Sequence, residues 1–209
     1  GLNNPADLKG KILGVVPKLD AQAFLQTILE NAGLTKKDAK IIDPGFGHIP
    51  YVIEKKIHAA HSLSNFELVL GDQIMAKSGK PKMRFMKYTD HGVPDFYYQL
   101  IVGSETWVKK NPHATCRFLR ASSKGLRQLI KDDTKAFDYV VKANNYMTPE
   151  EHRLTTDAVK KEFMGPNGEV FTMDLDVWKK AQAWALKYKL ITVGANPADY
   201  FTNEYIPKM

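Results

Sequence analysis

Residues 8–33 read LKGKILGVVPKLDAQAFLQTILENAG, and this stretch decides the fold class. The short apolar run Lys11–Val16 is typical of a buried strand. Asp20 is a candidate N-cap for the helix that follows, since Phe24 and Ile28 recur on one helical face and Gly33 ends the pattern. A strand followed directly by a helix is the start of a β-α-β arrangement, so we expect a parallel sheet covered by helices.

The same alternation continues to about residue 86. Further strands are expected at Ala39–Ile42, Ile57–Ala60 and Met83–Met86, with helices at Pro50–Lys56 and Asn65–Lys77. Together these elements predict one α/β lobe.

The second half has a different character. A turn-rich segment, Asp90–Asp95, indicates a hinge, and one more strand is expected at Tyr97–Val102. Beyond it the pattern is helical, with predicted helices at Asn111–Ile130, Thr134–Ala143, Thr148–Phe163 and Leu175–Lys189. Because a lone strand cannot form a sheet, we expect a segment before Gly1, or another chain, to complete this lobe.

Composition excludes several classes of protein. The chain has 209 residues and a net charge of +7, but its basic residues are dispersed in pairs rather than gathered in one stripe, so no nucleic-acid partner is predicted. No apolar run is long enough to span a membrane. A single Cys116 excludes an internal disulfide and a multi-cysteine metal cluster.

Catalytic motifs are also missing. Neither the G-x-S-x-G elbow nor the phosphate-binding G-x-x-x-x-G-K-[ST] loop occurs, and Gly45-Phe46-Gly47 is followed by Pro50 where a dinucleotide fingerprint needs glycine. We therefore predict no catalytic residue, no metal site and no cofactor.

Polar side chains follow the strand at Ile57–Ala60, namely Ser62, Ser64, Asn65 and Glu67. In open α/β sheets, ligands bind beyond the carboxyl ends of the strands, so these residues are candidate ligand contacts. The same spacing also fits a capping box, in which Ser64 caps the next helix and Glu67 completes the box.

The loops after the first two strands are expected to open onto the same edge. They add Asp20, Gly45 and Phe46 to the candidate ligand-binding residues. Phe46, between two glycines, is either a stacking surface for a flat ligand or an anchor for its loop.

Several segments resemble type 2 periplasmic binding proteins. Asp7–Lys11, followed by an apolar strand, resembles the start of their second lobe. HSLSNFE at residues 61–67 and GVPDFY at residues 92–97 resemble the branch that carries thiamin pyrimidine precursors. SETWVKKNP at residues 104–112 and the tail Phe201–Pro207 are similar to later segments of that branch.

The resemblance implies a fold of two α/β lobes joined by a hinge, with a ligand held between them. Residues 8–87 would form the complete second lobe and residues 88–94 the hinge. Residues 95–209 would be the mostly helical C-terminal part of the first lobe, whose N-terminal part is absent.

The resemblance also implies a function without catalysis. An extracytoplasmic solute-binding protein, periplasmic or lipid-anchored, captures a small polar or heteroaromatic ligand and delivers it to the permease of an ABC transporter. Asn65 and Glu67 would contact the pyrimidine. His61, Leu63 and Ser64 depart from the glycine and aromatic residues of the branch, so its stacking surface is not expected here.

Three alternatives remain open. One is an enzyme similar to the pyrimidine synthase of the same fold, which the resemblance associates with iron and a cysteine-rich segment. Another is a carrier of sulfonate or nitrate, although Glu67 would repel an anion. The third is a sensor domain whose cleft has decayed.

Overall fold

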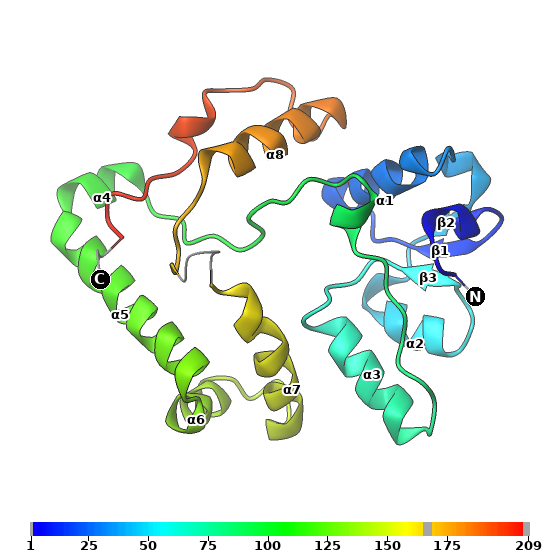
Figure 1. Ribbon diagram of the computed structural model, residues 1–209, viewed down its shortest axis with the longest axis horizontal. Coiled ribbons are helices and arrows are strands. Elements are labelled where there is room, and N and C mark those ends of the chain that lie inside the picture. The colour runs from blue at the N-terminus through cyan, green and yellow to red at the C-terminus, as the bar shows by residue number, and fades with distance from the viewer. Residues whose placement is uncertain (1, 165–168, 207–209) are drawn as a thin grey trace. The chain divides into compact units, whose positions relative to one another are not determined.

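A computed structural model describes residues 2–164 and 169–206 of the chain. It divides them into two compact units (Figure 1). The first comprises the described residues up to Asp95 together with Lys180–Gly194, and the second comprises Phe96–Lys179 together with the described residues from Ala195 on. The helix α8 (Leu175–Lys187) begins in the second unit and ends in the first.

The first unit contains a parallel sheet, as the alternation of strands and helices predicts. Its strands β1 (Ile12–Gly14), β2 (Lys40–Ile42) and β3 (Ala59–Ala60) lie in the order β2-β1-β3. Gly14 at the end of β1 pairs with Ile42 on one side and with Ala60 on the other. The carboxyl ends of the three strands therefore lie side by side.

Helices follow each strand of this sheet. They are α1 (Leu19–Asn31), α2 (His48–Ile53) and α3 (Glu67–Lys77), and the short 3-10 helices are η1 (Pro5–Leu8), η2 (Lys36–Asp38), η3 (Gly45–Gly47) and η4 (Tyr88–His91). Helix α1 begins two residues earlier than predicted, with Lys18 rather than Asp20 as its N-cap. Asp20 is thus not the N-cap, and its carboxylate instead accepts a hydrogen bond from the N–H of Ala21 within the first turn.

The core of the first unit is built around α1 and β1. Phe24 and Leu29 of α1, Leu13 of β1 and Ile57 before β3 are all at most 4% exposed. Each such side chain contributes about 1.5–3 kcal/mol by leaving water. Gly14 makes this packing possible, because a Cβ there would lie 2.6 Å from Cδ1 of Ile57.

The second unit is helical among its described residues. It contains α4 (Glu105–Lys110), α5 (Pro112–Lys131), α6 (Thr134–Ala143), α7 (Pro149–Val159), η5 (Lys160–Glu162), the start of α8 and η6 (Pro197–Asp199). The four longer helices match the predicted ones closely. The capping box predicted at Thr148 is present, with Glu151 as its partner.

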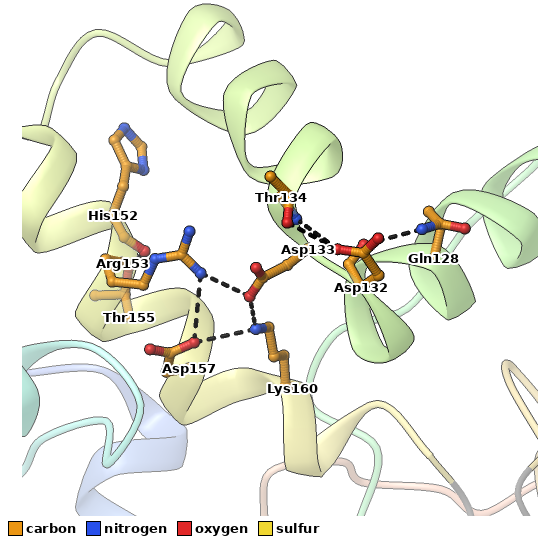
Figure 2. A network of polar contacts seen from close by, with 9 residues as sticks. All are labelled: Gln128, Asp132, Asp133, Thr134, His152, Arg153, Thr155, Asp157 and Lys160. Atoms are coloured by element: carbon orange, nitrogen blue, oxygen red, sulfur yellow. Dashed lines mark hydrogen bonds and ion pairs between the residues drawn. The ribbon is translucent and has the colours of Figure 1, made fainter.

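An ion-pair network joins α6 to α7 (Figure 2). The carboxylate of Asp133, just before α6, accepts from Arg153 at 2.6 Å and also pairs with Lys160. Asp157 on α7 contacts the same two cations at 3.8 and 3.1 Å. The guanidinium of Arg153 also lies 3.7 Å from the ring centre of Phe137, which adds a cation-π contact between the two helices.

The second unit buries little apolar surface. Within the described part of this unit, Val170 is the one buried hydrophobic side chain, whereas Tyr139 and Tyr146 are 71% and 93% exposed. Its packing is instead aromatic, since Trp178 stacks on Phe201 at 5.9 Å and also contacts Tyr97.

Two predicted strands are wrong. Met83–Met86 and Tyr97–Val102 have no regular secondary structure. The N–H of Met83 donates to the carboxylate of Asp72 on α3 at 2.7 Å, so a side chain has taken the place of a neighbouring strand. From Tyr98 to Val102 the apolar side chains are largely exposed, and no strand of the described residues pairs with them.

Candidate functional site

The candidate site lies at the carboxyl edge of the parallel sheet in the first unit. Three loops leave this edge and lead into α1, α2 and α3. The N–H of His61 donates to the carbonyl of Gly14 at 3.0 Å, which extends the pairing between β1 and β3 beyond the strand ends. In open α/β sheets, ligands bind beyond this edge of the strands.

Glu67 is the first residue of α3. Its Oε2 accepts a hydrogen bond of 2.8 Å from the N–H of Leu63, and its Oε1 lies 4.0 Å from Nε2 of His48. The predicted capping box with Ser64 does not form, because the N-cap is Phe66 and the backbone donor is that of Leu63. One carboxylate oxygen thus holds the turn, and the other faces α2.

His48 is the first residue of α2 and is only 8% exposed. Its Nδ1 lies 3.4 Å from the carbonyl oxygen of Gly45. Its Nε2 is buried and has no hydrogen-bond partner among the described residues. His48 was not among the residues predicted from the sequence, although a polar residue at the start of a helix after β2 was an available signal.

His61 contacts two aromatic rings, Phe24 and Tyr88, whose centres lie 5.3 Å from each other. It stacks on Phe24 at 5.9 Å and on Tyr88 at 5.7 Å, and its Nδ1 is 2.8 Å from the hydroxyl of Tyr88. Phe24 in turn stacks on Trp184, whose indole N–H donates to Thr27. We call Trp184, Phe24, His61 and Tyr88 the ring column.

Charges around the ring column shift the pKa of His61. Burial is the largest cause and lowers the pKa of this imidazole below its usual value. The carboxylates of Asp20 and Glu67 raise it, while His48 and Lys18 lower it further. These four charged or titratable groups therefore all influence the imidazole of His61 at the sheet edge. Burial keeps His61 neutral at physiological pH. Burial also raises the pKa of the Tyr88 hydroxyl, so the phenol keeps its proton.

The other predicted residues differ in their surroundings. The Oγ of Ser62 is buried and has no hydrogen-bond partner among the described residues, whereas Ser64 is exposed and Asn65 is half-buried in the turn before α3. Gly45 has φ of +56° and donates its N–H to Asp43. The backbone of Phe46 belongs to η3, but its side chain lies outside the described residues.

The site offers hydrogen-bond acceptors for a small polar molecule. In the described ranges, no group of three His, Cys, Asp or Glu side chains is arranged to hold a metal ion. No helix that the structure describes has the length and apolarity needed to cross a membrane.

Comparison with known proteins connects this geometry to a family. The family model described as NMT1/THI5 like matches residues 1–136. The chain is 24% identical to the 4-amino-5-hydroxymethyl-2-methylpyrimidine phosphate synthase THI12 of Saccharomyces cerevisiae, over 95% of this chain and 58% of that protein. It is 21% identical to the formylaminopyrimidine-binding protein of Halalkalibacterium halodurans, over 87% of this chain and 55% of that protein.

A solved structure shows the same fold. The periplasmic sulfonate-binding protein SsuA from Methylobacillus flagellatus matches with a TM-score of 0.61 at 17% identity, over 98% of this chain and 61% of that one. The chain thus has the type 2 periplasmic-binding-protein fold over the part it covers, and it spans less than two thirds of each of these relatives.

Proposed function

Because the chain belongs to the NMT1/THI5-like family, we propose that it binds a small heteroaromatic amine related to the thiamin pyrimidine precursors. The binding site is the carboxyl edge of the sheet in the first unit. Asn65, Glu67 and Ser62 contact the ligand, and Asp20, Gly45 and the loop of Phe46 border it. The name of the Halalkalibacterium relative, a formylaminopyrimidine-binding protein, supports this class of ligand.

The observation that carries the proposal is the position of Glu67. Its side chain is only 25% exposed, and the N–H of Leu63 fixes one oxygen while the other remains available. A carboxylate held in this way accepts a hydrogen bond from an exocyclic amine with assistance from its charge. Reversible binding needs such convergent hydrogen bonds and no activated nucleophile.

We place this binding activity in transport. The protein captures its ligand outside the cytoplasm, in the periplasm or while anchored to lipid at the cell surface, and delivers it to an ABC permease. The fold neighbour SsuA, which is named as a periplasmic binding protein, supports this setting.

Isothermal titration with 4-amino-5-hydroxymethyl-2-methylpyrimidine tests the proposal. The wild-type chain is expected to bind, and Glu67→Gln is expected to weaken binding about tenfold or more, since a hydrogen bond to a charged group is lost. Glu54→Gln is the matched control, because Glu54 pairs only with Lys56 among the ion pairs of the described residues and is half exposed. Equal affinity of Glu67→Gln and wild type would contradict the assignment of the site.

A synthase is the second candidate, because the Saccharomyces and Uromyces fabae relatives are named as pyrimidine phosphate synthases. The 209 residues hold one cysteine, the free thiol Cys116 on α5, and no cysteine-rich segment. Iron that copurifies stoichiometrically, together with formation of a new pyrimidine, would favour the synthase.

An anion carrier is a further alternative. Heat released on titration with taurine or nitrate, and none with a pyrimidine, would favour it.

We also propose that additional polypeptide, either a preceding segment of the same protein or another chain, completes the second unit. The apolar faces of its helices support this, since Phe118 on α5 and Tyr139 on α6 are more than half exposed. In this arrangement the second unit is part of the first lobe of the family, and residues 88–94 act as the hinge.

A further inference from the structure

His48 and Glu67 present two acceptor atoms to one small space. Nε2 of His48 is buried with no hydrogen-bond partner in the part of the chain that the structure describes, and Oε1 of Glu67 lies 4.0 Å away from it. Buried polar atoms in folded proteins nearly always have a hydrogen-bond partner, so an orphaned nitrogen at a ligand-binding edge indicates a position that a ligand fills. The two residues begin different helices, His48 at the start of α2 after β2 and Glu67 at the start of α3 after β3.

The neighbouring contacts decide which atoms are acceptors. The carbonyl of Gly45, 3.4 Å from Nδ1, can only accept, so this contact favours the neutral tautomer of His48 whose hydrogen resides on Nδ1. Nε2 then carries a lone pair. Oε2 of Glu67 already accepts from Leu63, which leaves Oε1 as a second lone-pair site.

In this tautomer Nε2 of His48 and Oε1 of Glu67 are both acceptors, so they cannot bond to each other. A nitrogen with two hydrogens, placed about 2.9 Å from each acceptor, satisfies both. The structure assigns His48 as a ligand-contacting residue that forms, with Glu67, a paired-acceptor site for a primary amino group. This inference rests on the proposed function and deepens it, because it makes the amino group the feature that the protein recognises.

The paired acceptors predict a definite selectivity. An oxo group presents lone pairs to lone pairs, and a dimethylamino group has no hydrogen to donate, so ligands that carry either should be rejected. Sulfonate and nitrate should be rejected for the same reason. Other polar groups at this edge include His61, Asp20, Lys18, Ser62 and Asn65, and Lys18 is the formal cation among these five.

Two substitutions at position 48 separate recognition from structure. His48→Gln places an amide oxygen near the position of Nε2 and keeps an acceptor, whereas His48→Leu removes it. Titrations should compare 4-amino-5-hydroxymethyl-2-methylpyrimidine with its 4-oxo and 4-dimethylamino analogues. His113→Leu is the control, because His113 is an exposed histidine on α5 in the second unit.

We expect the wild type to prefer the amino ligand at least about tenfold, a difference of one hydrogen bond to a charged or buried group. His48→Leu should bind it about tenfold more weakly and lose most of that preference, while His48→Gln and His113→Leu should keep it. Unchanged far-UV circular dichroism of His48→Leu would confirm that this variant still folds. If His48→Leu does not fold, the comparison relies on His48→Gln.

The outcomes separate the two proposals. If His48→Leu binds and discriminates like the wild type while Glu67→Gln loses binding, the inference is overturned and the proposed function stands. If the wild type binds none of the pyrimidines, the proposed function fails and the inference fails with it. A wild type that binds the dimethylamino analogue as tightly as the amino ligand overturns the inference alone.

Discussion

At the scale of single residues, the state of His61 depends on its burial in the ring column. Its pKa is lowered from 6.5 chiefly because burial disfavours the charged ring. The unfolded chain therefore takes up a proton as the pH falls below about 6.5, while the folded protein does not. Stability should be complete above this pH and should decrease as the pH falls through the window down to the lowered pKa of the folded state.

His61→Phe tests this linkage, since phenylalanine keeps the stack but cannot be protonated. The urea midpoint of the wild type should fall between about pH 7.5 and about pH 5.5, and the variant should lose less. Carboxylates with lowered pKa values, such as Asp133, do not contribute in this window, because their unfolded pKa values lie near 4. An equal decrease in both proteins would show that another group carries the pH dependence.

Gly92 makes a second residue-scale prediction. Its φ is +94°, and a Cβ there would lie 1.6 Å from Nδ2 of Asn31, which donates to the carbonyl of His91. Gly92→Ala should lower the free energy of unfolding by about 2–3 kcal/mol through backbone strain and the loss of that hydrogen bond. Gly79→Ala is the control, because Gly79 has φ of +65° in open space, and it should cost only about 1–2 kcal/mol. Equal costs would contradict a role for Asn31.

The candidate site could be predicted only in part at this scale. The strand that ends at Ala60 places Ser62, Asn65 and Glu67 at the sheet edge, and the family motif points to the same segment. The orphaned Nε2 of His48 could not be predicted, because hydrophobic periodicity does not report which polar atom is buried without a partner. The capping role of Glu67 could be anticipated, but the choice of the Leu63 N–H depends on the turn geometry.

At the scale of elements, helices with strong local signals were predicted well and isolated strands were not. Thr148-Pro149 and Asn111-Pro112 set helix starts through local chemistry, and the structure confirms both. A strand depends on a partner strand, which is often distant in sequence. Met83–Met86 has the composition of a strand, but the carboxylate of Asp72 takes its first N–H.

The junction of α6 and α7 makes the element-scale prediction. Lys160 and then Arg153 hold the pKa of Asp133 below its usual value, so the charged form is favoured in the folded protein (Figure 2). Asp133→Asn should lower the urea midpoint of the second unit at neutral pH, because both cations lose their shared partner. Glu105→Gln is the control, since Glu105 pairs with Lys109 on the surface, where ion pairs contribute little. A larger effect at Glu105 would show that the network does not hold the two helices together.

At the scale of the whole molecule, burial is distributed unevenly. Leu13 of β1 and Phe24, Leu25, Ile28 and Leu29 of α1 are at most 5% exposed, whereas α5 buries Ser123 and no hydrophobic residue. Local opening of a helix costs less when few apolar contacts must be broken. The amphipathic pattern of α5 nevertheless predicts a helix with one packed face, and the additional polypeptide proposed above would cover that face.

Hydrogen exchange followed by mass spectrometry tests this difference within a single sample. In the 209-residue chain, amides of α5 and α6 should exchange faster than those of α1, although α5 is the longest described helix. Added polypeptide that completes the second unit should slow the exchange of α5 and leave α1 unchanged, because only α5 gains buried apolar contacts. Protection of α5 equal to that of α1 in the chain alone would mean that the second unit is stable as it stands, and the proposed completion would then have no energetic basis.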